Sequence, residues 1–516
     1  MQGTREPSRY GENIVMKSQL RMMGFVSALT LAVAGPAMAQ SSGPVVTVTG
    51  GDVHGRMVNG SLSFQGIPFA APPLATLRWK APQPVVPWTT ARDGARAGPS
   101  CLQNNENWNK ADWLRGSEDC LTINVRTASL SGKRPVLVWI HGGSNRAGSG
   151  TGATESPIVD QGVVVVSFNY RLGILGFLSH RGLAKEQGGT SGNYGLMDQI
   201  AALKWVHDNI ARFGGDPDQV TLFGESAGSQ DVSLMLATPA AQGLFRAAIM
   251  QSGTPGFGMR FRSHDDALKI GDQLDEISGS GGDIDTLRAL SPVALFEMQS
   301  KLQDPVAKGN DFLFLRTTVD GKVLPDAPDR LIAQQTPKPV IIGTDKVEFG
   351  PGPGSAPLEA FSQFWFGDNG PAALAAYRAE QTSVDPRRGN LELRMQSDAQ
   401  FHCPANRLAD LLLSKGWPVW RYEFDVGDNG GLTRHAYEVS FVFGRKAAGG
   451  GAQMQDYWAA LALAGDPNAS TPLNAKRPRW DRLTAAKPVT LVFGNDKTVQ
   501  VQGQPRSAMC GWSAAF

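Results

Sequence analysis

The chain carries little net charge and lacks the short motifs of several large enzyme classes. Its 49 Lys and Arg residues nearly balance 47 Asp and Glu residues, which leaves a formal net charge of +2 over 516 residues. This balance indicates no basic surface for a polyanion, so we expect no nucleic-acid partner. The sequence also contains no CxxC, HExxH or GxGxxG motif, which argues against zinc-protease and dinucleotide chemistry.

The apolar stretch near the N-terminus is too short to span a membrane. It covers residues 22–35, whereas a spanning helix needs about 20 apolar residues. Lys17 and Arg21 precede it, and the small-x-small sequence Ala37-Met38-Ala39 follows it. This order is typical of a secretory signal peptide with its cleavage site. We therefore predict that residues 1–39 are removed, and that the mature chain is secreted or periplasmic and has no membrane span.

The sequence has only four cysteines. In an exported protein they suggest two disulfides, which allow three pairings. Cys101 and Cys120 are close in sequence, so the simplest pairing joins these two and leaves Cys403 to bond Cys510. Free buried thiols are the alternative.

The middle of the chain alternates short apolar runs with helical patterns, which is typical of parallel strands joined by crossover helices. A helix is expected at 194–213, where apolar residues recur at helical spacing. Strands are expected at 135–140, 163–167, 220–223, 247–251, 339–342, 419–424 and 489–493. The stretches 254–335 and 350–415 predict cap and rim insertions. No repeat or linker divides the chain, so we expect one domain at 40–516, with a large, mostly parallel central sheet flanked by helices.

A candidate nucleophile follows the strand expected at 220–223. The sequence Gly224-Glu225-Ser226-Ala227-Gly228 is the G-x-S-x-G pattern, in which a serine stands on a sharp turn between a strand and a helix. The tight backbone of that turn requires small residues at both flanking positions. The placement predicts an α/β-hydrolase fold with Ser226 as the nucleophile; an ordinary glycine turn is the alternative.

A second glycine-rich loop follows the strand expected at 135–140. It reads His141-Gly142-Gly143-Ser144. In this position backbone N–H groups can point at a developing oxyanion, together with the N–H of Ala227. A plain glycine turn is the alternative.

The catalytic histidine and acid must follow the serine in this fold, in the order serine, acid, histidine. Of the histidines, only His264, His402 and His435 come after Ser226. His435 is the candidate, because it lies in a glycine-bordered loop after the strand expected at 419–424. For the acid, Asp345 and Glu348 both follow the strand expected at 339–342, and either could orient the imidazole.

Together these motifs resemble the type-B carboxylesterase and cholinesterase family. The likeness runs over nearly the whole mature chain and appears at residues 64–70 (FQGIPFA), 118–125 (EDCLTINV), 193–199 (NYGLMDQ), 213–217 (FGGDP), 223–228 (FGESAG) and 319–321 (VDG). The resemblance implies a serine esterase that acts on a small-molecule ester through an acyl-enzyme and requires no metal or other cofactor.

The resemblance also implies roles for particular residues. The family's G-x-x-x-x-E pattern matches residues 343–348, which makes Glu348 the acid rather than Asp345. It supports His435, because the family's histidine stands shortly before a glutamate and an F-V-F-G-like run. The oxyanion donors would be Gly143, Ser144 and Ala227. Both expected disulfides match family positions.

Two departures from the family bear on the substrate. Ser144 replaces the third glycine of the oxyanion loop, and Asn145-Arg146 replaces an aromatic pair; Arg316 stands where relatives are usually neutral. An arginine beside a desolvated site suits a carboxylate. We therefore expect Asn145, Arg146 and Arg316 to bind substrate, and an acyl group with a free carboxylate. Esters of di- or tricarboxylic acids, such as fumonisin-type tricarballylate esters, fit this expectation.

Other interpretations are open at this point. The arginines could pair with protein carboxylates, in which case a general carboxylesterase for neutral alkyl or aryl esters is expected. The same triad could hydrolyse amides or lactams. A non-catalytic, cholinesterase-like binding protein is a further class, although such relatives typically lack the serine or histidine that this chain has. The sequence does not indicate an oligomeric state.

Overall fold

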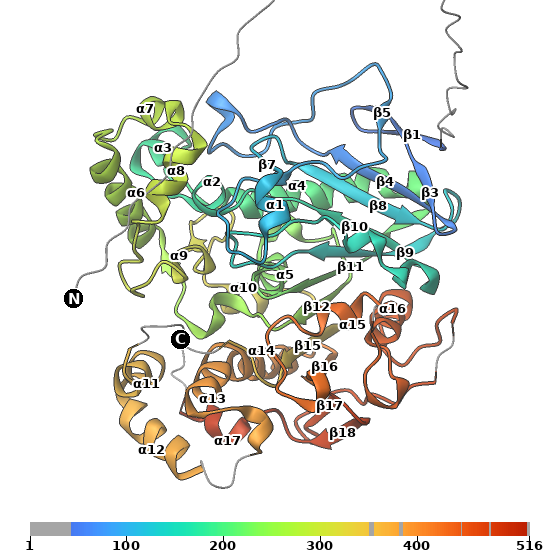
Figure 1. The fold of residues 1–516 in the computed structure, drawn as a ribbon, viewed down its shortest axis with the longest axis vertical. Coiled ribbons are helices and arrows are strands. Elements are labelled where there is room, and N and C mark those ends of the chain that lie inside the picture. Colours follow the sequence, from blue (N-terminus) through green and yellow to red (C-terminus); the bar gives the residue numbers. More distant parts are fainter. Residues whose placement is uncertain (1–42, 350–355, 381–384, 445, 474–475, 513–516) are drawn as a thin grey trace, which may run out of the picture. The chain divides into compact units, whose positions relative to one another are not determined.

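The centre of the protein is an 11-stranded sheet with the strand order β18-β17-β16-β15-β12-β11-β9-β10-β8-β4-β3 (Figure 1). The computed structural model describes residues 43–349, 356–380, 385–444, 446–473 and 476–512. The signal peptide predicted at 1–39 lies outside these residues.

The inner strands of the sheet all pair in parallel. They are β10 (Val164–Phe168), β9 (Arg134–Ile140), β11 (Gly215–Glu225), β12 (Ala247–Gln251), β15 (Val340–Asp345), β16 (Val419–Asp425) and β17 (Val489–Gly494). Each coincides with a strand predicted from the sequence. The predicted crossover helix is α4 (Tyr194–Asn209), followed by a short turn of helix to Phe213. The mostly parallel sheet flanked by helices is confirmed.

The edges of the sheet are antiparallel and were not predicted. They consist of β8 (Thr122–Thr127), β4 (Ser61–Pro68), β3 (Arg56–Val58) and β18 (Thr498–Gln502). The hydrophobic pattern of β4 and β8 is weak because both strands bury polar side chains. The Arg126 guanidinium, for example, donates from Nε to Ser61 Oγ at 2.6 Å inside the protein. Buried polar pairs of this kind leave no apolar signal in the sequence.

Helices cover both faces of the sheet, and strand alternation decides which residues they cover. Val136 and Val138 of β9 belong to one core cluster together with α4, α5 (Ala227–Ala237) and α14 (Cys403–Ser414). Leu137 and Trp139 belong to another cluster together with α16 (Met454–Ala464). The nucleophile turn therefore lies at the junction of a sheet and a helix that are both buried.

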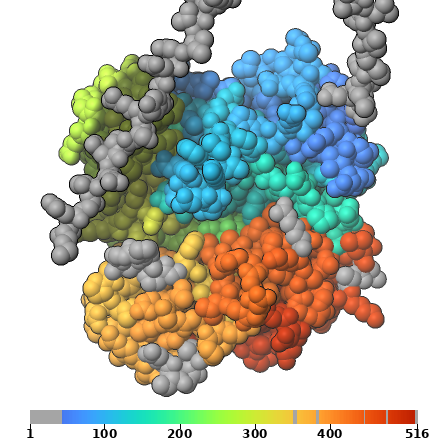
Figure 2. All heavy atoms as spheres, viewed as in Figure 1, coloured from blue at the N-terminus to red at the C-terminus, as the bar shows by residue number. Residues whose placement is uncertain are grey.

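The predicted insertions hold most of the remaining helices. They are α6 (His264–Ser278), α7 (Ile284–Ala289), α8 (Pro292–Gln299), α9 (Phe312–Leu315), α10 (Pro328–Ile332), α11 (Leu358–Phe366), α12 (Gly370–Glu380) and α13 (Leu391–Ser397). In Figure 2 these segments, coloured from green to orange, occupy the left side of the face shown. Among the described residues, no helix combines the length and apolarity that crossing a membrane requires.

Two disulfides close loops of very different length. Cys101 bonds Cys120, 19 residues away, and Cys403 bonds Cys510, 107 residues away. The second bridge joins the start of α14 to the end of α17 (Ser507–Cys510). The predicted pairings are confirmed, and no free thiol is present in the described chain, which includes all four cysteines.

Candidate active site

Ser226 stands on a strained turn between β11 and α5. Its backbone has φ 55° and ψ −126°, a sparsely populated conformation that persists only where the surroundings enforce it. The flanking glycines make the turn possible: a Cβ at Gly224 would lie 2.6 Å from the Gly228 carbonyl carbon, and one at Gly228 would lie 2.1 Å from the Ile140 oxygen. The steric argument made for these glycines from the sequence is thus met by the structure.

The loop after β9 packs directly against this turn. A Cβ at Gly142 would lie 2.6 Å from the Glu225 oxygen and 3.1 Å from Ser226 Cβ. Gly143 and Ser144 both have positive φ, of 106° and 58°. Within the described chain, the amides of these two residues donate to no other protein group. The loop can therefore present N–H groups beside the serine, and it accepts the side chain of Ser144.

Asn145 does not face a substrate, which corrects its predicted role. The residue is fully buried. Its Nδ2 donates to Asp231 Oδ1 at 3.2 Å, and its Oδ1 accepts from the Tyr170 hydroxyl at 3.0 Å. The side chain was expected to bind substrate, but both of its polar ends are occupied by protein groups. Its bond to Asp231 of α5 instead ties the oxyanion loop to the helix that carries Ser226.

Asp231 is a residue of this site that the sequence analysis missed. Burial raises its pKa to about 7, and it also accepts a bond from Gln199 Nε2 at 2.6 Å. The Tyr170 hydroxyl oxygen also lies 2.8 Å from the His141 carbonyl oxygen and shares its one proton between that oxygen and Asn145 Oδ1, so both ends of the loop are held. The available signal was a single charged residue on a helix that has no other charged side chain.

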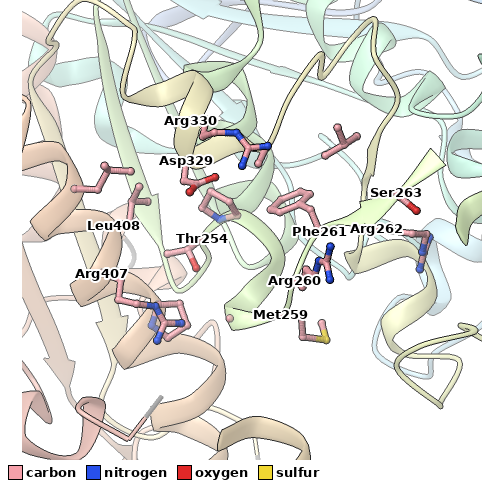
Figure 3. Close-up of a pocket in the computed structure, with 16 residues that line it drawn as sticks. Thr254, Met259, Arg260, Phe261, Arg262, Ser263, Asp329, Arg330, Arg407 and Leu408 are labelled. Atoms are coloured by element: carbon pink, nitrogen blue, oxygen red, sulfur yellow. The ribbon is translucent and has the colours of Figure 1, made fainter. Parts of the chain in front are cut away.

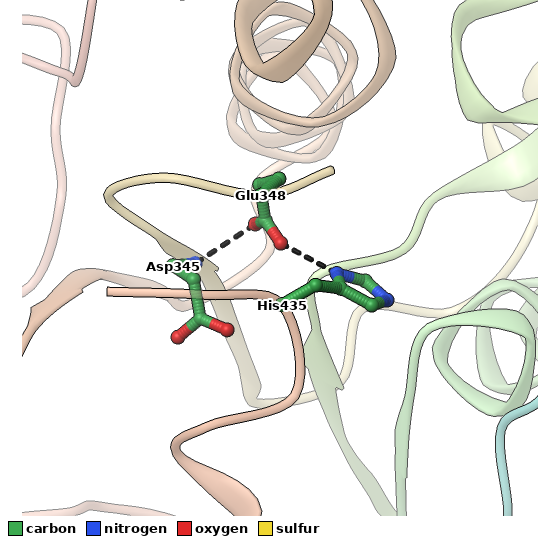
Figure 4. Close-up of side chains that lie close together, drawn as sticks. All are labelled: Asp345, Glu348 and His435. Atoms are coloured by element: carbon green, nitrogen blue, oxygen red, sulfur yellow. Dashed lines mark hydrogen bonds and ion pairs between the residues drawn. The ribbon is translucent and has the colours of Figure 1, made fainter. Parts of the chain in front are cut away.

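His435 and Glu348 meet through a short hydrogen bond. Nδ1 of His435 donates to Oε2 of Glu348 at 2.6 Å (Figure 4). The other oxygen, Oε1, accepts from the Asp345 backbone N–H at 2.9 Å, and the Glu348 N–H donates to Ser397 Oγ at 3.0 Å. The acid that contacts the imidazole is therefore Glu348, while Asp345 helps through its backbone.

The other two histidines that follow Ser226 lie in different surroundings. His402 is buried with Nδ1 3.0 Å from the Thr344 hydroxyl. His264 accepts a bond from the Ser191 backbone N–H at 3.2 Å. Neither one contacts Ser226 or its candidate acid, which is consistent with the choice of His435.

Nε2 of His435 faces a carboxylate next to the nucleophile. Glu225 Oε1 lies 3.0 Å from it, and both side chains are less than a tenth exposed. Burial lowers the pKa of His435, but Glu225 and Glu348 outweigh that effect and raise the pKa to about 9. Burial also raises the pKa of Glu225 to about 8. The Glu225 carboxylate therefore favours the charged form of the imidazole, and burial favours the protonated form of Glu225.

More carboxyl groups surround this histidine than the sequence analysis indicated. Asp345 and Glu438 are fully buried, and burial raises the pKa of each. Ligand-type atoms of Asp345, Glu348 and His435 lie within 4.8 Å of one another, a spacing that a metal site could also use. Here the Glu348 to His435 hydrogen bond accounts for the spacing of two of the three groups.

Aromatic rings border His435. The centroids of Phe349 and Phe401 lie 4.1 and 5.0 Å from that of the imidazole. Phe349 is 48% exposed, so it lies at the open side of the site. A low-polarity wall of this kind strengthens electrostatic interactions inside the site.

The two arginines predicted to bind substrate differ from each other. Arg316 is buried with Nη1 2.6 Å from Asp304, which also binds Arg262. Its guanidinium is therefore held by a protein carboxylate inside the protein, which corrects its predicted role. Arg146 lies beside the oxyanion loop, 3.1 Å from Asp311 and 3.8 Å from Glu106. The Asp311 side chain is 81% exposed, so this ion pair is open to water.

The comparisons with known proteins agree with this geometry. A model of the carboxylesterase family matches residues 42–352 and 367–512. The chain therefore belongs to the carboxylesterase family and is a carboxylic ester hydrolase. Among its relatives, a fumonisin B1 esterase of Sphingopyxis macrogoltabida is 34% identical over 492 residues, which cover 87% of each chain.

Two further comparisons concern one kind of esterase. A para-nitrobenzyl esterase of Bacillus subtilis is 36% identical over 419 residues, covering 78% of this chain and 83% of that protein. A solved PNB esterase structure superimposes with a TM-score of 0.78 at 30% identity, covering 92% of this chain and 99% of the other. The predicted α/β-hydrolase fold and family are confirmed.

Replacing Asn145 with Ala should impair the chemical step. Asp231 and Tyr170 would lose a buried partner, at a cost of about 1–3 kcal/mol, and the loop would no longer be tied to α5. Because a lost oxyanion donor lowers kcat by about 10²–10³, we expect Asn145→Ala to lower kcat by about tenfold or more and to change KM less. Steady-state kinetics on a neutral ester measure this. Ser144→Gly is the matched control and should retain activity, since the donors are backbone groups; an unchanged kcat in Asn145→Ala would contradict the assignment.

Replacing Glu225 with Gln should move the pH profile. A general base must be neutral, so activity rises as pH passes the pKa of His435. The Glu225 carboxylate raises that pKa, and its removal should shift the acid limb of kcat/KM to lower pH by about one unit or more. Glu297→Gln changes an exposed carboxylate on α8 and should leave the profile in place. Equal profiles for the two variants would show that Glu225 does not control the charge of His435.

Proposed function

We propose that this ester hydrolase works through an acyl-enzyme on Ser226, with His435 as the base and Glu348 as the orienting acid. The observation that carries the proposal is the 2.6 Å hydrogen bond between His435 Nδ1 and Glu348 Oε2, in a protein whose Ser226 occupies a strained turn at the start of a buried helix. Such a bond fixes the tautomer that leaves Nε2 free to accept a proton.

The proposed steps give each of these residues one role. His435 Nε2 takes the Ser226 hydroxyl proton while Oγ bonds to the ester carbonyl carbon. The N–H groups of Gly143, Ser144 and Ala227 stabilise the oxyanion that forms. The carbon–oxygen bond to the alcohol then breaks, and His435 returns the proton to the departing alkoxide. Water repeats the attack with His435 as base, which releases the acid and restores Ser226; no metal or cofactor takes part in these steps.

Substitutions in the triad should abolish turnover without unfolding the protein. We expect Ser226→Ala and His435→Ala to lower kcat by about 10⁵–10⁶-fold, because nucleophile and base act as one unit. In Glu348→Gln we expect kcat to fall by about 10³–10⁴-fold. Asp345→Asn is the matched control. Its kcat should fall far less, because the Asp345 side chain makes no hydrogen bond to the imidazole in the described structure. The measurement is the turnover of a nitrophenyl ester by each variant, with circular dichroism as the check on folding. A larger loss of kcat in Asp345→Asn than in Glu348→Gln would refute the assignment.

We propose further that the preferred substrates are esters whose acyl part carries a free carboxylate, as in di- and tricarboxylic acids. Arg146 supports this proposal, because it lies beside the oxyanion loop and its closer protein partner, Asp311, is largely exposed to water. Exposed ion pairs contribute little, about 0–1 kcal/mol, so a substrate carboxylate can replace Asp311 at low cost. The similarity to a fumonisin B1 esterase also supports it. The second candidate is a neutral alkyl or aryl ester, favoured by the rings of Phe349 and Phe401 beside His435.

A pair of matched esters tests the role of Arg146. A hydrogen bond to a charged group contributes about 1.5–3 kcal/mol, so Arg146→Gln should lower kcat/KM for the 4-nitrophenyl hemisuccinate by about 10- to 150-fold. The neutral 4-nitrophenyl pentanoate is of similar size and should change little. Asp311→Asn frees Arg146 and should raise kcat/KM for the hemisuccinate alone. Equal losses on both esters in Arg146→Gln would show that the residue only supports the loop, and the neutral-ester function would then stand.

We also propose that the protein is exported and that its mature form begins near residue 40. The basic, apolar and small-residue segments of the N-terminal sequence support this, as do two disulfides, which form in oxidising compartments. N-terminal sequencing of protein from a bacterial periplasm or culture medium should read from Gln40. A sequence that still contains residues 22–35 would contradict the cleavage.

A further inference from the structure

A second cavity lies between the segment Pro255–Gly258, strand β13 (Arg262–Ser263) and helices α10 and α14. Its volume is about 590 Å³, within the roughly 300–1,000 Å³ of small-molecule sites. Figure 3 shows side chains from all four elements around it. The cavity is therefore large enough for an organic ligand of moderate size.

This cavity is separate from the catalytic site. Neither Ser226 nor His435 lines it. Phe257, in the wall segment, packs on Phe401 with ring centroids 5.5 Å apart, and Phe401 in turn packs on His435. A layer of aromatic rings thus stands between the cavity wall and the imidazole.

Most of the cavity lining is apolar. The hydrophobic side chains come from three segments of the chain and are Met259, Phe261, Val319, Leu408 and Leu411. Burial of an apolar chain against such a lining is favourable in proportion to the area removed from water. The lining accordingly favours a ligand with a hydrocarbon portion.

The lining also carries an arginine whose charge no protein group neutralises. Nη1 of Arg407 is buried and has no hydrogen-bond partner, and the described residues offer Arg407 no ion pair. Burial lowers the pKa of this guanidinium, and no carboxylate opposes the effect. A buried charge without a partner is costly, so an anion that entered the cavity would gain a strong contact.

The neighbouring charges favour an anion over a cation. Arg330 also lines the cavity and pairs with Asp326, whereas Arg262 shares the single carboxylate of Asp304 with the buried Arg316. The charged lining residues without an ion pair in the described chain are Arg260 and Arg407 against Asp329. Positive charges therefore outnumber negative charges around the cavity.

We propose that this cavity binds an amphiphilic anion, a carboxylate with an apolar chain, and that Arg407 holds its carboxylate. The inference does not depend on the substrate proposed for the catalytic site. It adds a second ligand site to an enzyme whose own reaction releases carboxylates.

Calorimetric titration with decanoate tests the site. The catalytic serine is first blocked by a diethyl organophosphate, so that binding in the catalytic site does not contribute. We expect the blocked enzyme to bind one decanoate per chain, and Arg407→Gln to weaken binding by about tenfold or more. Arg56→Gln removes an exposed arginine from β3 and should leave the affinity unchanged. Decyltrimethylammonium, of equal chain length and opposite charge, should not bind.

A second variant distinguishes loss of the site from misfolding of Arg407→Gln. Leu411→Trp fills the cavity without changing its charge and should also abolish decanoate binding. Unblocked Arg407→Gln and Leu411→Trp enzymes should keep their turnover of a neutral ester, which verifies the fold. Wild-type affinity in both variants would overturn the proposal. Decanoate binding that is lost when the serine is blocked would overturn it as well, because the ligand would then occupy the catalytic site.

Discussion

The catalytic site depends on how closely the turn at Ser226 approaches the end of β9. At Gly142, Gly224 and Gly228 the backbones are so near one another that any Cβ would meet backbone atoms at 2.1 to 2.6 Å. The loop after β9 therefore packs directly against Ser226, whose backbone adopts a strained conformation at this contact. Strain of this kind costs about 1–3 kcal/mol per residue and must be held by the surrounding structure. The buried sheet below and the buried helix α5 behind provide that support.

The features that the sequence predicted are those with local signals. The inner strands are continuous apolar runs, because parallel strands are buried on both faces, and the turn at Ser226 has its glycine pattern. His435 followed from the order of the triad and from its glycine-bordered loop. The choice of Glu348 over Asp345 came only from the family resemblance, since both residues follow the same strand; in the structure their carboxyl groups differ in which one reaches the imidazole.

The features that the sequence did not predict depend on partners far along the chain. Asn145 was expected to face substrate because it follows the expected oxyanion donors, and Arg316 because relatives are usually neutral at its position. Asn145 is instead bonded to Asp231, 86 residues away, and Arg316 to Asp304 within an insertion that has no regular pattern. The antiparallel strands β4 and β8 were not predicted for a related reason, because their buried polar side chains hydrogen-bond to one another across the sheet. Pairing of this kind is a property of the fold and has no local signature.

The residues proposed as the triad follow β11, β15 and β16 in the chain, and these strands lie on one side of the sheet with β12 between the first two. His435 and Glu348 are separated by 87 residues of chain and meet only when β15 and β16 are paired. A nascent or partly threaded polypeptide therefore carries the nucleophile long before it carries the base in place. With the proposed triad, ester turnover would therefore begin only once the whole sheet has assembled.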